Sequence, residues 1–260
     1  MNSSMIAQPT STSPRSERSQ RLLGSVVPRA RVTCAERDEM YALLETYFSR
    51  TDRRRFETDL NEKETVVLLR DAGSGRIEGF STLMRMTASI DHKEVIAFFS
   101  GDTIIDRAYW GDTILSRLWS QTVFAEAARL TAERPAASVY WFLICSGYKT
   151  WRFLPVFFRE FYPNPDRPTP PHIQRIVDTL GARKFGDEYV PDSGIVRMRA
   201  ATPLRGGVAN VTSERLRDPQ VAFFARRNPG HALGDELACL TQISRENLTP
   251  AGHRMVSSPL

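Results

Sequence analysis

The sequence has few of the residues that build covalent or metal-linked frameworks. Its 260 residues include only three cysteines and four histidines. The cysteines, Cys34, Cys145 and Cys239, are odd in number and far apart, and no histidine pair joins them in a zinc-binding spacing. We therefore expect no metal centre, and a reducing cytoplasmic environment.

Long hydrophobic runs are also missing. The longest apolar stretch is VYWFLIC, far short of the roughly 18 residues that a membrane-spanning helix needs. The first residues, MNSSMIAQPTSTSPRSERSQRLL, have no apolar core of a secretory signal. We expect no membrane span, and a basic disordered tail over residues 1–31, with a weak targeting segment as the alternative.

The net positive charge is small outside that tail. Residues 1–31 carry five arginines and one glutamate, which accounts for four of the formal net charge of +5. The remaining chain is close to neutral, so the composition argues against a nucleic-acid-binding surface. A local excess of arginine between Arg199 and Arg227 is either a solvated face or a surface for an acidic partner.

The pattern of apolar residues predicts a mixed α/β chain. Thr33 and Glu36 have the spacing of a capping box and indicate a helix from about residue 34. The stretch ETVVLLRDAGSGRIEGFSTLMRM reads as a β-hairpin, and EVIAFFSGDTIID as a long central strand. Apolar residues at helical spacing then predict a helix over residues 113–131, followed by the strand ASVYWFLIC. A strand, helix and strand in this order favour parallel neighbours.

The rest of the chain shows weaker patterns. GYKTWRFLPVFFREFYP is a very aromatic helix that Pro155 breaks, and HIQRIVDTLG is a short helix that ends at Gly181. GIVRMRA predicts a late strand. We expect a last helix in NPGHALGDELACLTQIS, within an appendage over residues 201–260 that packs on the main domain.

This order of elements, over residues 32–200, resembles the GNAT acyltransferase superfamily. The resemblance implies a mixed, mostly antiparallel central sheet flanked by helices. It also implies that AFFSGDTIID and VYWFLIC part from each other, so that a thioester arm lies between them. The implied activity transfers an acyl group from acyl-CoA or an acyl carrier protein to an amine of a small metabolite, amino acid or peptide, by direct attack in a ternary complex.

The loop DRAYWGDT departs from the family signature R/Q-x-x-G-x-G/A, since only its first glycine is present. Asp112 stands where a diphosphate is expected, and an ordinary helix cap is the alternative reading. A carrier protein, with a single phosphodiester, demands less of this loop than CoA does. The resemblance places donor binding at six positions: Ile104, Ile105, Arg107, Gly111, Asp112 and Thr113.

Two residues are candidates for the chemistry. Asp102, on the long strand, is the first choice for binding or deprotonating the amine, although a structural role for it is the alternative. Tyr148, just after the second strand of the pair, is the choice for protonating the departing thiolate, with Tyr162 as the second option. Cys145 ends a buried strand and is expected to be inert.

The aromatic density suggests an apolar pocket for a longer acyl chain or the acceptor. Its candidates are Trp110, Trp151, Phe153 and Phe157, and core packing is the alternative. Two other functions stay open. The chain is also compatible with a signal or lipid synthase of the acyl-homoserine-lactone type, or with a catalytically silent GNAT-like module that binds a partner.

Overall fold

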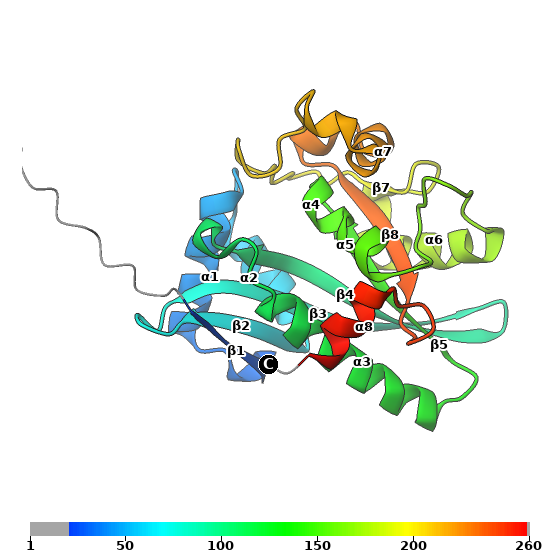
Figure 1. The fold of residues 1–260 in the computed structure, drawn as a ribbon, viewed down its shortest axis with the longest axis horizontal. Helices are drawn as coiled ribbons and strands as arrows, with labels where there is room; N and C mark the ends of the chain where they lie inside the picture. Colours follow the sequence, from blue (N-terminus) through cyan, green and yellow to red (C-terminus); the bar gives the residue numbers. More distant parts are fainter. Residues whose placement is uncertain (1–20, 259–260) are drawn as a thin grey trace, which may run out of the picture.

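The computed structural model describes residues 21–258 and has one mixed sheet flanked by helices (Figure 1). Its strands are β1 (Leu22–Pro28), β2 (Thr65–Asp71), β3 (Ile77–Ile90), β4 (Lys93–Ile105), β5 (Ser138–Cys145), β6 (Tyr189–Val190), β7 (Ile195–Val196) and β8 (Glu236–Gln242). Its α-helices are α1 (Cys34–Tyr47), α2 (Arg53–Asn61), α3 (Ile114–Glu133), α4 (Tyr148–Trp151), α5 (Phe153–Phe157), α6 (Pro171–Phe185), α7 (Pro219–Arg227) and α8 (Pro250–Ser257). The 3-10 helices are η1 (Arg29–Arg31), η2 (Arg107–Tyr109), η3 (Gly186–Glu188), η4 (Arg215–Arg217) and η5 (His231–Leu233).

The strands follow the order β1-β2-β3-β4-β5-β8-β7-β6. Within residues 21–258, β4 and β5 form the only parallel pair, and all other neighbours are antiparallel. The predicted fold class, a mostly antiparallel mixed sheet, is therefore confirmed. The predicted crossover from the long strand through a helix to a parallel strand is confirmed as well.

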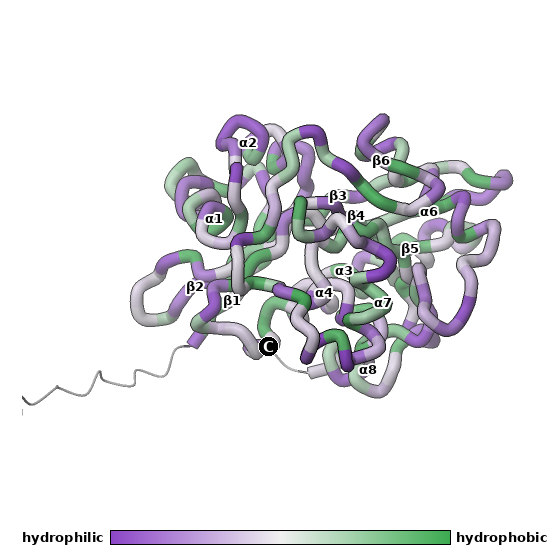
Figure 2. Tube along the Cα trace, turned by 90° about the horizontal axis from the view of Figure 1, so that it is seen from above, coloured by the Kyte–Doolittle hydropathy of each residue, from purple (hydrophilic) through white to green (hydrophobic). Residues whose placement is uncertain are grey.

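Helices cover both faces of this sheet. On one face, α3 to α5, α7 and α8 pack against Phe98, Trp141 and their neighbours. On the other face, α6 covers Phe99 and Phe142, while α1 and α2 cover the β2–β3 end. Figure 2 shows hydrophilic stretches toward the periphery, for example at α2, and hydrophobic ones along the central strands. The sheet is thus buried on both sides where β4 and β5 run together.

Local signals placed several elements correctly. The capping box holds the start of α1, since Glu36 N donates to Thr33 Oγ1 and Thr33 N donates to the Glu36 carboxylate. The β2–β3 hairpin, the long strand β4 and the broken aromatic helix, α4 and α5, are also present. In each case the residues that specify the element are close in sequence.

Other predictions of the elements were wrong. The predicted tail boundary at residue 31 does not hold, because Leu22–Pro28 pairs with β2 as an edge strand; residues 1–20 lie outside the described part of the chain. Helix α6 does not end at Gly181 but continues to Phe185. Glycine is needed at position 181 for packing, since a Cβ there would lie 2.7 Å from the Tyr189 ring.

The largest error concerns the C-terminal region. The predicted last helix is the strand β8, which pairs with β5 on one side and β7 on the other. The sixty C-terminal residues thus contribute a strand within the sheet, beyond packing on its surface. Five consecutive residues of β8 are buried, so both of its faces are covered. The prediction failed because such a short apolar run does not distinguish a strand from a helix. The predicted late strand is only the two residues of β7.

Candidate active site

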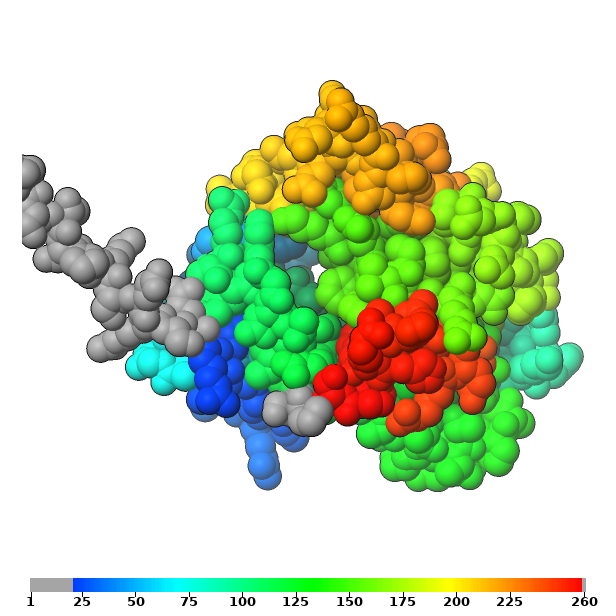
Figure 3. All heavy atoms as spheres, in the orientation of Figure 1, coloured from blue at the N-terminus to red at the C-terminus, as the bar shows by residue number. Residues whose placement is uncertain are grey.

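A crevice opens where β4 and β5 part. Their pairing ends at Ser100 and Leu143. Beyond this point β4 continues to Ile105 paired only with β3, while the end of β5 pairs with β8. The space-filling view in Figure 3 shows an opening between the loop that precedes α3 and the segment of α4 and α5. The expected separation of these two strands is therefore present.

The last residues of β4 offer an unpaired backbone edge. Asp106 N donates to Glu78 O at 2.7 Å, so the backbone groups of Asp106 face β3. Because successive residues of a strand alternate, those of Ile104 also face β3, whereas those of Thr103 and Ile105 face the crevice. Of the two residues predicted to bind the donor through their backbone, Ile105 is thus the one whose N–H and C=O groups face the crevice.

Trp110 covers part of this edge. Its indole Nε1 donates to Ile105 O at 3.1 Å, and its ring is 41% exposed. Arg107 Cζ lies 5.1 Å and Lys149 Nζ 3.3 Å from the centroid of the ring. Since Arg107 follows β4 and Lys149 follows β5, the indole bridges the two sides of the crevice. A ligand on this edge has to displace the Trp110 hydrogen bond.

A carboxylate lies at the beginning of α3, where the resemblance places a diphosphate. Asp112 Oδ1 accepts a hydrogen bond from Ile114 N at 2.7 Å, so the carboxylate caps the helix. The Thr113 side chain makes no capping bond, and Gly111 supplies a φ of +105° with open space around it. A carboxylate at this point repels a phosphate. The contacts of Asp112 therefore agree with the alternative interpretation, in which it is an ordinary helix cap.

Positive charge lies instead at the open end of the crevice. Burial lowers the pKa of Lys149, and the charges of Arg107 and Arg215 lower it further. These three cations come from η2, α4 and η4, which are far apart in sequence. The sequence alone indicated Arg107 and missed Lys149, because nothing local shows that α4 begins opposite η2. Three cations that repel one another favour an anionic ligand between them.

Asp102 lies on the unpaired part of β4. Burial and, to a smaller extent, the negative charge of Asp59 raise its pKa to about 6, against the opposing charges of Lys63 and Lys184. Among the described residues, no hydrogen bond or ion pair engages its carboxylate. A half-buried carboxyl group without a fixed partner is available to accept a proton near neutral pH. The assignment of Asp102 as base stays a prediction.

Glu236 is a second carboxyl group of this site and was missed by sequence reasoning. It is the first residue of β8 and accepts a hydrogen bond from Ser146 Oγ, while its Oε2 is buried without a partner. Burial raises its pKa to about 7, and the charge of Asp102 contributes to the increase. The sequence predicted a helix over residues 236–242. Because a helix was expected there, nothing in the sequence indicated that Glu236 lies near β4.

A buried lysine supports the wall beside Asp102. Lys63 is 2% exposed and donates to Asp59 Oδ2 at 2.6 Å, and Lys184 donates to the other oxygen at 3.2 Å. The Lys63 side chain passes so close to Gly101 that a Cβ at this position would lie 2.6 Å from Lys63 Cε. Glycine at position 101 therefore lets a positive charge approach the strand that carries Asp102.

The remaining predicted residues are distributed over two environments. Tyr148 is 4% exposed and belongs to the large core cluster that also contains residues of α3, and its hydroxyl has no hydrogen-bond partner within residues 21–258. Trp151 is fully buried against Phe161 and Phe223, so core packing describes its role. Phe153 is 40% exposed and contacts Phe157. The structure therefore does not gather the four predicted aromatic residues around one pocket.

Comparisons with known proteins return only partial similarities to solved structures. No protein-family model and no curated protein matches the sequence. Among solved structures, a protein from Enterococcus faecalis described as a probable N-acyltransferase aligns with a TM-score of 0.40 and 13% identity, over 54% of this chain and 33% of its own. A GNAT family N-acetyltransferase from Escherichia coli in complex with CoA aligns with a TM-score of 0.34 and 16% identity, over 52% and 68%.

Glucosamine-6-phosphate N-acetyltransferase from Arabidopsis thaliana aligns with a TM-score of 0.34 and 11% identity, over 52% of this chain and 88% of its own. The likeness spans only about a third of the length of the Enterococcus chain. The strand order and the parted parallel pair are those that the predicted fold implies. All three TM-scores lie below 0.5, so these alignments are partial similarities only.

No helix within residues 21–258 has the length and apolar character to cross a membrane. In the same part of the chain, no three side chains of histidine, cysteine, aspartate or glutamate gather as a metal site.

Proposed function

We propose that this protein is an N-acyltransferase that moves an acyl group from a phosphopantetheine thioester to an amine. The observation that carries the proposal is the parting of β4 from β5 after Ser100, which leaves backbone groups of Thr103 and Ile105 facing a crevice. A pantetheine arm contains two amide groups and can bond to such an edge as an added strand does. One end of the crevice has cations and its inner wall has carboxyl groups.

In the proposed complex, the phosphate of the donor lies at Arg107 and Lys149, at the cationic end of the crevice. Both cations lie against the Trp110 ring, so displacement of the indole from Ile105 O frees both the edge and the cations. Either CoA or an acyl carrier protein can supply the arm. The charge of Arg215, in η4, also acts on Lys149, and this supports an acidic carrier protein as a partner that docks between Arg199 and Arg227.

The acceptor amine lies on the side of the carboxyl groups. A protonated amine is attracted to the pair of Asp102 and Glu236 and loses its proton to Asp102. The nitrogen then attacks the thioester carbonyl carbon, the C–N bond forms and the C–S bond breaks, and the second proton that the nitrogen releases restores the proton donor of the thiolate. The thiolate takes a proton, for which Tyr148 is the proposed donor. The products are an amide and a free thiol, and no covalent acyl-enzyme is needed.

A direct assay tests this function. Full-length protein is incubated with acetyl-CoA or octanoyl-CoA and a panel of small amines and peptides, and the acylated product is identified by mass spectrometry. The same amines are offered with the corresponding acyl carrier protein thioesters. Amide formation with either donor supports the proposal. Binding of donor without any amide product favours the silent module, and binding of neither donor contradicts the proposed site.

Removal of the Lys149 charge is expected to weaken donor binding. In Lys149→Gln the KM for the donor should rise about tenfold, because a hydrogen bond to a charged group contributes about 1.5–3 kcal/mol. The effect should shrink at high salt, as partly exposed charges are screened. The matched control is Lys93→Gln, an exposed lysine at the opposite end of β4. An equal KM for both variants would place the phosphate elsewhere.

The carboxyl pair predicts the pH dependence of the reaction. The pKa values of Asp102 and Glu236 are raised to about 6 and about 7, so kcat/KM should rise with pH through this window and then level off. The free energy of unfolding should change with pH in the opposite direction. The folded state binds more protons than the unfolded chain above the ordinary carboxyl pKa, so the free energy of unfolding falls as pH rises through the window.

Steady-state kinetics and thermal denaturation over the same pH series measure both trends. In Glu236→Gln the decline of stability with pH should become smaller, since one of the two titrating groups is gone. An unchanged pH profile of both activity and stability in this variant would show that the two carboxyl groups do not titrate as described.

A further inference from the structure

A separate cavity lies on the α6 face of the sheet, away from the crevice. It has a volume of about 260 Å³, which is below the range of about 300–1,000 Å³ typical of pockets for drug-sized ligands. Its walls come from α6, from the turn between β6 and β7, from the segment before α6, and from the end of α7. Ala238 and Gly194 are the smallest of its lining residues and keep one wall open. A small metabolite fits this size.

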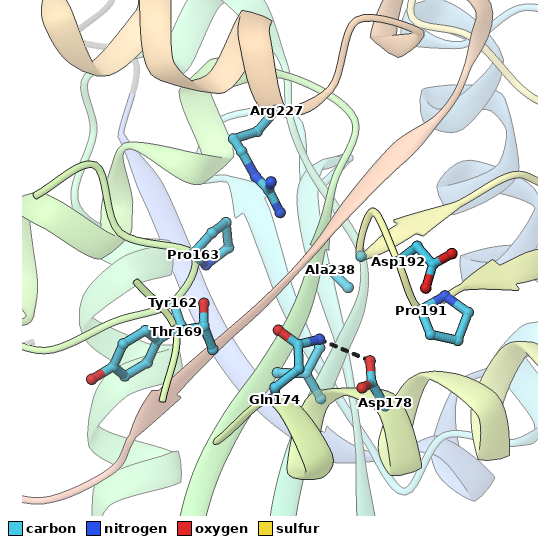
Figure 4. A pocket seen from close by; sticks show the side chains of 11 residues that line it. Tyr162, Pro163, Thr169, Gln174, Asp178, Pro191, Asp192, Arg227 and Ala238 are labelled. Carbon is cyan, nitrogen blue, oxygen red and sulfur yellow. Dashed lines mark hydrogen bonds between the residues drawn. The ribbon is translucent and has the colours of Figure 1, made fainter. Parts of the chain in front are cut away.

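Opposite charges face this cavity (Figure 4). Arg227, the last residue of α7, extends into it from one side, while Asp178 of α6 and Asp192 of the β6–β7 turn lie on other sides. Gln174 and Thr169 add polar groups to the lining.

These charges do not neutralise one another. Arg227 Nη2 donates to Ser193 O at 3.2 Å, and within residues 21–258 no carboxylate lies at ion-pair distance from its guanidinium. Asp178 Oδ1 accepts from Gln174 and from the Tyr189 hydroxyl, which leaves Oδ2 without a partner among the described residues. Asp192 has no hydrogen bond or ion pair in that part of the chain. Complementary groups held apart across a cavity suit a ligand that carries both charges.

We propose that this cavity binds a free basic α-amino acid. The α-carboxylate pairs with Arg227, whose planar guanidinium suits a carboxylate. The two ammonium groups pair with Asp178 and Asp192. Two carboxyl groups and one guanidinium leave a net negative charge in the cavity, so a ligand with one carboxylate and two cations is preferred over a neutral or acidic amino acid. None of the crevice residues lines this cavity, so the site does not depend on the proposed transferase reaction.

Calorimetric titration of the full chain with L-lysine tests the site. L-Lysine should bind, and three analogues should bind more weakly because each disrupts one pairing or the charge balance: L-norleucine, L-lysinamide and L-glutamate. In Arg227→Gln the Kd for L-lysine should rise at least about tenfold, since a charge-assisted hydrogen bond is lost. Arg227 is exposed, so this variant is expected to fold normally.

Two variants serve as controls. Arg226→Gln changes the neighbouring exposed arginine, which does not line the cavity, and should leave L-lysine binding unchanged. Asp102→Asn alters the crevice and should also leave it unchanged. The proposal is overturned if L-lysine does not bind, if L-lysinamide binds as tightly as L-lysine, or if Arg226→Gln weakens binding as much as Arg227→Gln.

Discussion

Replacing Asp102 by asparagine is expected to lower kcat/KM about 100-fold or more while leaving the fold intact. A positioned general base contributes roughly 10²–10⁴-fold to a reaction rate, and asparagine keeps the shape of the side chain without accepting a proton. The pKa of Asp102 is raised by burial, so its ionised form is disfavoured in the folded protein. The neutral side chain should therefore preserve or increase the melting temperature at neutral pH.

The combination of lost activity and kept stability separates catalysis from structure. If Asp102 only bonded to its surroundings, asparagine would lower the melting temperature and leave much of the activity. The matched control is Asp91→Asn in the β3–β4 turn, where the carboxylate is exposed and pairs with Arg175. That variant should keep full activity. An Asp102→Asn variant with near-normal kcat/KM would show that Asp102 is not the general base.

Replacing Ser100 by alanine is expected to destabilise the protein by about 2–5 kcal/mol. Ser100 is the last residue of β4 that pairs with β5, and its hydroxyl oxygen accepts from Trp119 Nε1 at 3.0 Å and from Trp141 Nε1 at 2.9 Å. Both indoles are buried, so alanine leaves two N–H groups without an acceptor, and each costs roughly 1–3 kcal/mol. Denaturant unfolding measures the difference.

Ser120→Ala provides the comparison for this effect. Ser120 is also buried, but its hydroxyl donates to the carbonyl of Arg117 within α3, so its loss leaves no indole unsatisfied and should cost less than about 1 kcal/mol. If both substitutions destabilise the protein equally, the two hydrogen bonds that Ser100 accepts do not stabilise the place where β4 and β5 part. A selective loss at Ser100 supports this role.

The sequence predicted those elements whose signals are local. The capping residues of α1, the glycines of the β2–β3 turn and the apolar periodicity of α3 each specify an element within a few residues. Helix α2 was not recognised because RRRFETDLN is mostly polar and only Phe56 and Leu60 turn inward. The strand β8 was mistaken for a helix because its extended conformation is imposed by pairing with β5 and β7.

The site shows the same division. Asp102 and Arg107 could be proposed from the sequence because they follow directly from the predicted course of β4, and their roles stay predictions. Glu236, Lys149 and Lys63 were not, since each comes from a distant segment and enters the site only through the tertiary fold. The loop before α3 illustrates a different limit. Its residues suggested both a donor site and a helix cap, and only the hydrogen bond from Ile114 N to Asp112 identifies the cap.

Hydrogen exchange of the backbone amides tests the central claim most directly. The claim is that the unpaired edge of β4 holds the donor arm. Addition of CoA, or of an acyl carrier protein with its phosphopantetheine, should slow exchange in a peptide that covers residues 101–106. A peptide from β2, which is paired on both sides, serves as the reference and should not change. Donor binding that leaves exchange in residues 101–106 unchanged would contradict the account.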